Sequence, residues 1–194
     1  MTKGDATRQA VIDQAVEIAG RLGVAGLTIG TLASASGMSK SGLYAHFRSK
    51  EALQLAVLGS AREHFVDQVI RPALAAPRGE PRVRVLFERW LVTSFSGSSG
   101  CLFVSAAVEF DDQPGPVRDL VVKDHWDLLD SLAQVYRSGA KDGAFRDDLA
   151  PEQFAHDLHG LMLSHFHACR LLRDPAAEAH TRYTFERLLQ SLLR

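Results

Sequence analysis

The stretch GLTIGTLASASGMSKSGLYAHFRSKEAL, residues 26–53, predicts two short helices joined by a tight turn and followed by a third helix. Thr28, Ser39 and Ser49 each stand where a hydroxyl oxygen can accept a hydrogen bond from the free N–H groups that begin a helix. Gly37 lies between the first two helices, where a tight turn needs a residue that tolerates a positive φ. This pattern of helix caps and a turn glycine is typical of a helix-turn-helix.

The middle helix, predicted over residues 40–47, has two unlike faces. Leu43 and Phe47 are four residues apart and are expected to face the core. The opposite side carries donors and no acid: Lys40, Ser41, Tyr44 and Arg48. Cationic and hydroxyl groups bind phosphates and base edges, so this face suits the major groove of duplex DNA. The alternative is an ordinary solvated face of a small helix.

Residues 27–53 resemble the DNA-binding signature of the tetracycline-repressor (TetR) family of bacterial one-component regulators. The resemblance covers about the first quarter of the chain, and nine residues fall in register: Thr28, Ala33, Gly37, Ser39, Leu43, Tyr44, Phe47, Lys50 and Glu51. Two positions differ from the commoner family pattern. Gly42 stands where a hydroxyl residue is frequent, and Ala45 stands where an aromatic or basic residue is frequent.

The resemblance implies a role for individual residues of this stretch. Tyr44 and Lys50 would hold phosphates of double-stranded operator DNA, and Thr28 would hold the flanking backbone. Five further residues would lie at or near the operator: Ser39, Lys40, Ser41, Gly42 and His46. The function implied is a transcriptional regulator, most often a repressor.

Composition and charge agree with a local DNA-binding region on a globular protein. The 194 residues are 46% hydrophobic and 23% charged, which is ordinary for a globular chain. Residues 1–50 carry six Lys and Arg against three acids, whereas residues 51–194 carry sixteen against twenty. A basic head on an acidic body favours a localised DNA footprint over general binding to polyanions.

The chain lacks the features of membrane and secreted proteins. No run of about eighteen apolar residues is present, and the N-terminus has no apolar signal segment. Its two cysteines, Cys101 and Cys169, lie far apart and fit a reducing compartment better than a disulfide scaffold. We therefore expect a cytoplasmic protein without a membrane partner. A thiol sensor made of the two cysteines remains an alternative.

Apolar periodicity predicts an all-α fold of about nine helices. Beside the two helices of the helix-turn-helix, they are expected near residues 7–22, 50–74, 82–96, 101–110, 117–138, 149–172 and 174–193. The segment 101–110 is nearly all apolar and could be a buried strand, but no partner strand is evident. We expect a DNA-binding domain over residues 1–50, a linking helix over 50–74, and a regulatory and dimerisation domain over 51–194.

The last two predicted helices are the best candidates for a dimer interface. One recognition helix, here the helix predicted over residues 40–47, contacts few base pairs. Specific binding therefore usually needs two half-sites and two copies of the protein. Two such helix pairs would form a four-helix bundle across a two-fold axis. The predicted interface residues are Leu158, Leu161, His165, Leu172, Tyr183, Leu188 and Leu192. The alternative is that these residues line the core of the monomer.

Large flat side chains in the middle of the chain predict a pocket for a mostly apolar, unknown small-molecule effector. The predicted lining is Phe87, Trp90, Ser94, Phe103, Glu109, Phe110, His125, Trp126, Met162 and Phe166, with the serine, glutamate and His125 as polar contacts. The alternatives are that the aromatic residues only fill the core, and that the regulator binds no ligand.

Enzyme motifs are missing from the sequence. There is no HExxH, no G-x-S-x-G elbow and no GxxxxGK[ST] loop. Four histidines on one predicted helix, His156, His159, His165 and His167, leave a metal sensor as an alternative. We expect no cofactor and no metal site. The sequence thus predicts a ligand-responsive repressor that dimerises on a palindromic operator and is released by a small molecule.

Overall fold

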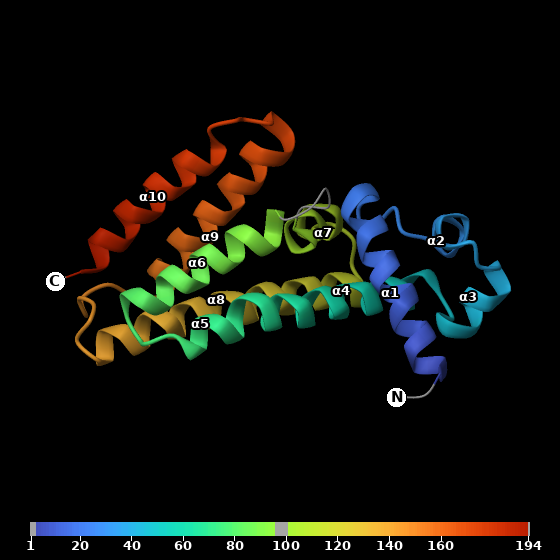
Figure 1. Ribbon diagram of the computed structural model, residues 1–194, viewed down its shortest axis with the longest axis horizontal. Coiled ribbons are helices and arrows are strands. Elements are labelled where there is room, and N and C mark those ends of the chain that lie inside the picture. Colours follow the sequence, from blue (N-terminus) through green and yellow to red (C-terminus); the bar gives the residue numbers. More distant parts are fainter. Residues whose placement is uncertain (1–2, 96–100, 194) are drawn as a thin grey trace. The chain divides into compact units, whose positions relative to one another are not determined.

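The computed structural model describes residues 3–95 and 101–193, with the backbone alone described at Lys3, Ser94 and Phe95. All regular secondary structure in these two ranges is helical (Figure 1). The elements are α1 (Lys3–Leu22), α2 (Ile29–Ser36), α3 (Lys40–His46), α4 (Lys50–Phe65), η1 (Val66–Ile70), α5 (Arg71–Ala75), α6 (Glu80–Phe95), α7 (Leu102–Phe110), α8 (Pro116–Lys141), α9 (Pro151–His167), η2 (Ala168–Leu172) and α10 (Ala177–Leu192).

The two η elements are π-helical segments inside longer helices. The first joins α4 to α5 without a break, and the second continues α9. Counted this way, the described residues form nine continuous helices, which confirms the predicted fold class. The apolar segment before Phe110 is α7, so its assignment as a helix is also confirmed.

The chain divides into two compact units. Unit 1 contains the described residues of Met1–Phe65 and Phe95–Asp124, and unit 2 those of Val66–Ser94 and His125–Arg194. Unit 1 therefore holds α1 to α4, α7 and the first part of α8. Unit 2 holds η1, α5, α6 up to Ser94, α9, η2, α10 and the remainder of α8. A functional domain boundary near residue 50 stays a prediction.

Helix α2 begins and ends at the predicted residues. The Thr28 hydroxyl oxygen accepts from the Thr31 N–H at 3.0 Å, and the Thr31 hydroxyl oxygen accepts from the Thr28 N–H at 2.8 Å. This reciprocal pair is a capping box, here with threonine in the place more often taken by Glu or Gln. Gly37 follows the helix with φ +68° and donates its N–H to the Ala33 carbonyl. A side chain would strain that left-handed conformation.

The other two predicted caps are also present. Ser39 Oγ accepts from the Gly42 N–H at 3.1 Å at the start of α3. Ser49 Oγ accepts from the Ala52 N–H at 3.0 Å at the start of α4. Because each hydroxyl satisfies one of the N–H groups that a helix leaves free, short sequence signals locate both helices.

One apolar core holds the helices of unit 1 together. It includes Val11, Ile12, Ala15, Ile18 and Ala19 of α1; Leu27 and Leu32 around α2; Leu43 and Phe47 around α3; Leu53, Val57 and Leu58 of α4; and Leu102, Ala106, Phe110, Val117 and Val121 of α7 and α8. The helix-turn-helix thus shares its core with α7 and the start of α8, far along the chain.

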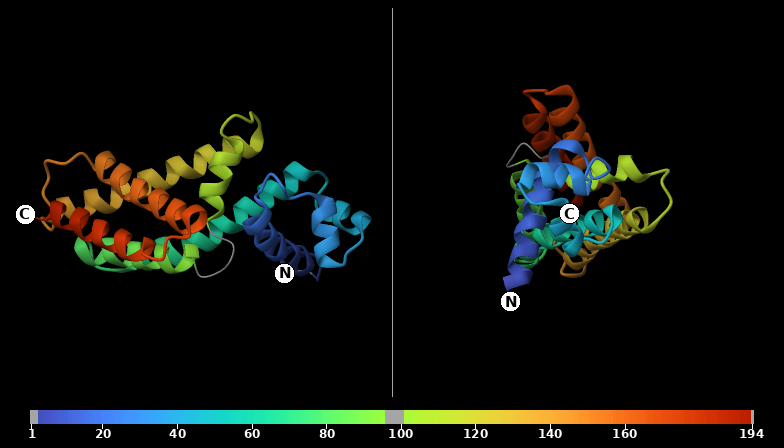
Figure 2. Two further views of the ribbon diagram at one scale, coloured as in Figure 1. Left: turned by 90° about the horizontal axis from the view of Figure 1, so that it is seen from above. Right: turned by 90° about the vertical axis from the view of Figure 1, so that its right-hand side faces the viewer.

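Unit 2 is organised by aromatic stacking and by a helix hairpin. Phe87 of α6 stacks on Phe185 of α10 with ring centroids 3.8 Å apart and planes 4° apart. Tyr136 of α8 stacks on Phe145 and Phe154 at 5.8 and 5.5 Å. Helices α9 and α10 lie side by side as an antiparallel hairpin (Figures 1 and 2).

Candidate nucleic-acid interface

Helix α3 has the two faces that its sequence predicts. Leu43 and Phe47 are buried, whereas Lys40 and Ser41 are exposed. The Tyr44 ring is 54% exposed although it is large and aromatic. An aromatic side chain held in solvent on a short helix is available to a binding partner.

The donor groups of this face gather around the beginnings of α2 and α3. Ser39 Oγ and Ser41 Oγ lie 3.1 Å apart. A methyl group added at Gly30 would lie 3.6 Å from Thr28 Oγ1 and 4.0 Å from Lys40 Cε. The side chains of Thr28 and Lys40 therefore approach the same point on α2.

Gly42 occupies a crowded position beside the cap of α3. A methyl group added there would lie 3.2 Å from Ser39 Oγ, which already accepts the Gly42 N–H. A side chain would therefore press on the capping hydroxyl. This packing is a local reason for a glycine at position 42.

All eight residues predicted to bind DNA lie in unit 1, and none is buried. Thr28, Gly42 and His46 are half-buried, and the other five are exposed: Ser39, Lys40, Ser41, Tyr44 and Lys50. Lys50 is the first residue of α4, at the end where the helix dipole favours a phosphate. The role of these residues in DNA binding remains a prediction.

Two distant side chains hold the turn between α1 and α2. The Ala25 N–H donates to Glu109 Oε2 at 2.6 Å, and Gln54 Nε2 donates to the Val24 carbonyl at 2.7 Å. Gly23, with φ +81°, lies so close that an added methyl group would be 2.4 Å from Glu109 Oε1. Sequence analysis suggested Glu109 as a contact to an effector and missed this contact, because no local signal links residues 84 positions apart.

The residues predicted to line an effector pocket are divided between the two units. Phe103, Glu109 and Phe110 belong to unit 1, and the side chain of Ser94 lies outside the described residues. The remaining six belong to unit 2: Phe87, Trp90, His125, Trp126, Met162 and Phe166.

Within unit 2, these six residues do not share one environment. Phe87 and Trp90 are buried, the first against Phe185 and the second edge-on to His165 at 5.5 Å. The side chain of Trp126 is 68% exposed. For Phe87 and Trp90, the packing matches the alternative that they fill the core.

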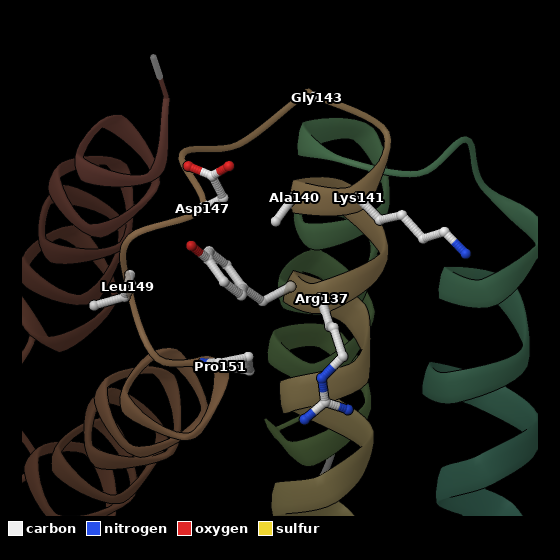
Figure 3. A pocket seen from close by; sticks show the side chains of 8 residues that line it. Arg137, Ala140, Lys141, Gly143, Asp147, Leu149 and Pro151 are labelled. Atoms are coloured by element: carbon white, nitrogen blue, oxygen red, sulfur yellow. The ribbon is translucent and has the colours of Figure 1, made fainter.

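A pocket of about 450 Å³ lies elsewhere in unit 2, between the end of α8 and the start of α9 (Figure 3). It is lined by Tyr136, Arg137, Ala140, Lys141, Gly143, Asp147, Leu149 and Pro151. The Tyr136 hydroxyl donates to the Arg146 carbonyl at 2.5 Å, and burial raises the pKa of that hydroxyl. Lys141 extends away from Asp147 and Leu149 (Figure 3). None of the predicted effector-binding residues lines this pocket.

The residues predicted for a dimer interface are of two kinds. Leu158, Leu161, His165 and Leu192 are buried within the chain, so they offer little surface to a partner and match the alternative that they line the core. Leu172 and Tyr183 are exposed, and Leu188 is half-buried. Of the seven predicted residues, these three leave apolar surface for a second chain.

Two close pairs in unit 2 involve histidines from the predicted metal-sensing helix. The rings of His125 and His159 lie 5.9 Å apart. Burial lowers the pKa of His159, and the nearby charges of His125 and His156 lower it further. Among the described residues, no group of three or more His, Cys, Asp or Glu side chains is placed to hold a metal ion.

The second pair joins His165 to a thiol. His165 Nδ1 lies 2.7 Å from Thr181 Oγ1, and His165 Nε2 lies 3.4 Å from Cys169 Sγ. Burial lowers the pKa of His165 and raises the pKa of the Cys169 thiol. Cys101 and Cys169 are both free and belong to different units.

Among the helices of the described residues, none is both long enough and apolar enough to cross a bilayer.

Known structures share this fold over nearly the whole chain. A TetR-family transcriptional regulator from Cytophaga hutchinsonii has a TM-score of 0.85 at 21% identity, covering 100% of this chain and 98% of its own. A putative transcriptional regulator from Saccharomonospora viridis, in complex with choline, has a TM-score of 0.84 at 20% identity, covering 98% and 99%. AibR, in complex with isovaleryl coenzyme A and operator DNA, has a TM-score of 0.71 at 21% identity, covering 92% and 97%.

Comparisons of sequence assign the family. No curated protein is significantly similar to the chain. Residues 11–57 match the family of bacterial regulatory proteins described as the tetR family, and residues 79–185 match the tetracyclin repressor-like C-terminal domain. The second match alone covers more than half of the chain, and both matches lie in the order expected for one regulator. The chain belongs to the TetR family of DNA-binding transcriptional regulators, which are not enzymes.

Proposed function

We propose that this regulator is a repressor that binds a palindromic operator as a homodimer and leaves it when a small molecule binds. The proposal places its action in the cytoplasm, where bacterial DNA is found. One observation carries it: α3 begins at the side-chain cap of Ser39 and presents an exposed, acid-free face, within the segment that matches the family's DNA-binding domain.

The predicted contacts divide into two kinds. Tyr44 and Lys50 offer a hydroxyl and a cation for phosphates, which position a protein without reading sequence. Lys40 and Ser41 lie in the first turn of α3, where a recognition helix usually meets base edges. The buried Leu43 and Phe47 hold this helix against unit 1, so its outer face is presented as a rigid surface.

A second copy of the chain is the proposed partner of α9 and α10. Four apolar side chains on the hairpin are exposed: Leu163, Leu171, Leu172 and Tyr183. Gly160 is exposed on the same helix as Leu163, and a methyl group added there would meet no atom within 4 Å. A helix surface with apolar side chains and a glycine allows a second helix to approach closely.

The linking helix is the proposed route from effector to operator. It runs without a break from Lys50 to Ala75, and its π segment, Val66–Ile70, begins directly after the first of the two chain segments that form unit 1. A π segment weakens the regular hydrogen bonding of a helix and is a common place for a bend. Effector binding would favour a bend that changes the separation of the two reading helices, so that both no longer fit their half-sites. The complexes of relatives with choline and isovaleryl coenzyme A support a small-molecule effector.

DNA binding is tested by selecting binding sites from a random duplex library and measuring affinity over a salt series. We expect a palindromic site. Lys50→Ala should weaken binding to all duplexes and reduce the slope of log K against log salt by about one. Tyr44→Phe should also weaken binding broadly, whereas Lys40→Ala should change the preferred bases. Undiminished binding by all three variants would remove the assigned surface.

The dimer is tested by sedimentation equilibrium. Leu163→Glu combined with Leu171→Glu should give monomers and abolish cooperative binding to the palindrome. Val92→Glu is the control, because Val92 is an exposed apolar residue on α6, outside the hairpin. Unchanged dimers in the double variant would exclude this interface. The effector step fails if a tightly bound small molecule leaves operator affinity unchanged across a full titration.

A further inference from the structure

Arg8 of α1 lies against the C-terminal end of α3, the proposed recognition helix. Its guanidinium carbon, Cζ, is 5.2 Å from the centroid of the Phe47 ring, and Phe47 is the C-cap of α3. Arg8 is exposed, whereas Phe47 is only 1% exposed. A cation this close to an aromatic ring is attracted by the electrons of the ring face.

The position of Arg8 follows from the packing of α1. Val11 and Ile12, three and four residues later, are buried in the core of unit 1. Residues three or four apart share a helix face, so Arg8 continues the buried stripe beyond the edge of the core. Its aliphatic stem can cover Phe47 while the charged end stays in water.

The contact with the Phe47 ring leaves the hydrogen-bonding capacity of Arg8 available. A guanidinium uses its flat face against a ring, whereas its five N–H donors lie in the plane and point outward. In the part of the chain that the structure describes, no carboxylate forms an ion pair with Arg8. The two residues that flank the cap of α4, Arg48 and Lys50, are also exposed cations.

We propose that Arg8 is a further phosphate-binding residue of the DNA interface, a role that rests on the proposed DNA-binding function. Phe47 orients the guanidinium of Arg8. The N–H groups along the edge of that guanidinium bind a backbone phosphate beside the phosphates held by Lys50 and Tyr44. The contact is with the DNA backbone, so it adds affinity without changing sequence preference. It extends the DNA-binding surface from α2, α3 and α4 to the N-terminal part of α1.

Two substitutions separate a phosphate contact from simple packing on Phe47. Arg8→Met keeps an unbranched apolar stem over the ring and removes the charge, whereas Arg8→Lys keeps the charge and removes the planar donors. Arg21→Ala is the control, because Arg21 is exposed on the same helix about 20 Å away along its axis. Thermal unfolding of each variant verifies that unit 1 still folds.

The experiment measures affinity for a selected operator and for an unrelated duplex over a salt series. We expect Arg8→Met to weaken binding to both duplexes and to reduce the salt slope by about 0.9, the value for one phosphate contact. Arg8→Lys should keep the slope, and Arg21→Ala should match the natural protein. An unchanged slope in Arg8→Met, beside a reduced slope in Lys50→Ala, overturns the role of Arg8 alone. A natural protein that binds no duplex overturns both this role and the proposed function.

Discussion

Single glycines inside helices respond to their surroundings, and two of them give a matched test. A methyl group added at Gly139 of α8 would lie 2.5 Å from the Phe145 ring and 3.1 Å from the Gly79 Cα, whereas one added at Gly59 of α4 would meet no atom within 4 Å. Alanine favours a helix over glycine by about 1 kcal/mol, but overpacking a core costs about 1–3 kcal/mol.

We therefore predict opposite signs for the same substitution. Gly59→Ala should raise the free energy of unfolding by up to about 1 kcal/mol. Gly139→Ala should lower it by about 1 kcal/mol or more, because Phe145 is buried and stacked on Tyr136 and has little room to move. Urea denaturation of both variants measures the difference, and equal effects would contradict the packing described at Gly139.

At the scale of elements, Glu109 links α7 to the turn between α1 and α2. A hydrogen bond from a backbone N–H to a carboxylate contributes about 1.5–3 kcal/mol. Glu109 is partly exposed, so Glu109→Ala should lower the free energy of unfolding by no more than the lower part of that range. Glu109→Gln, which keeps an acceptor oxygen, should lose less. Asp112→Ala, an exposed acidic neighbour, serves as the control in the same denaturation experiment. A loss no larger than that of the control would mean that Ala25 finds another acceptor.

Helices α6 and α10 carry the same pattern, E-x-x-x-R-x-x-F-E, at residues 80–88 and 178–186. Arg84 pairs with Glu80 of its own helix and with both carboxylate oxygens of Glu186, at 2.5 and 2.9 Å. Arg182 pairs with Glu178 and Glu88 in the corresponding way. Phe87 and Phe185 stack between the two sets. The two antiparallel helices therefore contribute the same residues to their contact, which is close to two-fold symmetric.

This contact should weaken in acid. The hydrogen bonds from Arg84 lower the pKa of Glu186 in the folded protein. The pair therefore stabilises the fold fully at pH values above the unfolded pKa of about 4.3. This stabilisation is lost as the pH falls through the folded pKa. Because both side chains are partly exposed, we expect a coupling of only about 0.2–1 kcal/mol at neutral pH. A double-mutant cycle with Arg84→Ala and Glu186→Ala measures it at pH 7 and pH 3. A coupling that is equal at both values would contradict the ion pair.

At the scale of the whole molecule, two histidines should make stability depend on pH near neutrality. Burial lowers the pKa of both His159 and His165 in the folded protein. Below the unfolded value of about 6.5, the unfolded chain then binds more protons, so stability is kept above that pH and falls as the pH drops below it. The slope cannot exceed about 1.4 kcal/mol per pH unit for each histidine.

The measurement is urea denaturation at pH 7.5 and pH 5.5. The natural protein should be less stable at the lower pH, and His159→Gln should reduce that difference. His64→Gln is the control, since His64 is exposed on α4 in the other unit. The same pH dependence in all three proteins would show that protonation of His159 does not oppose folding.

Sequence determined the parts of this protein that depend on near neighbours. The hydroxyls of Thr28, Ser39 and Ser49 and the glycine at 37 mark helix ends, because capping and a positive φ are satisfied within four residues. Those residues located the helix-turn-helix, and apolar periodicity predicted the number of helices. The exposed face of α3 followed from the same local geometry.

Tertiary structure alone decided which helix faces pack against other helices of the chain and which stay exposed. Leu158, Leu161, His165 and Leu192 have the same apolar helical spacing whether they face a core or a second chain, and only the packing of unit 2 shows them buried. The contacts of Glu109 with Ala25 and of Arg8 with Phe47 join residues far apart in the chain. Periodicity tells how each helix is divided into faces, but burial depends on the helices that come to lie against it, and that arrangement is a property of the whole folded chain.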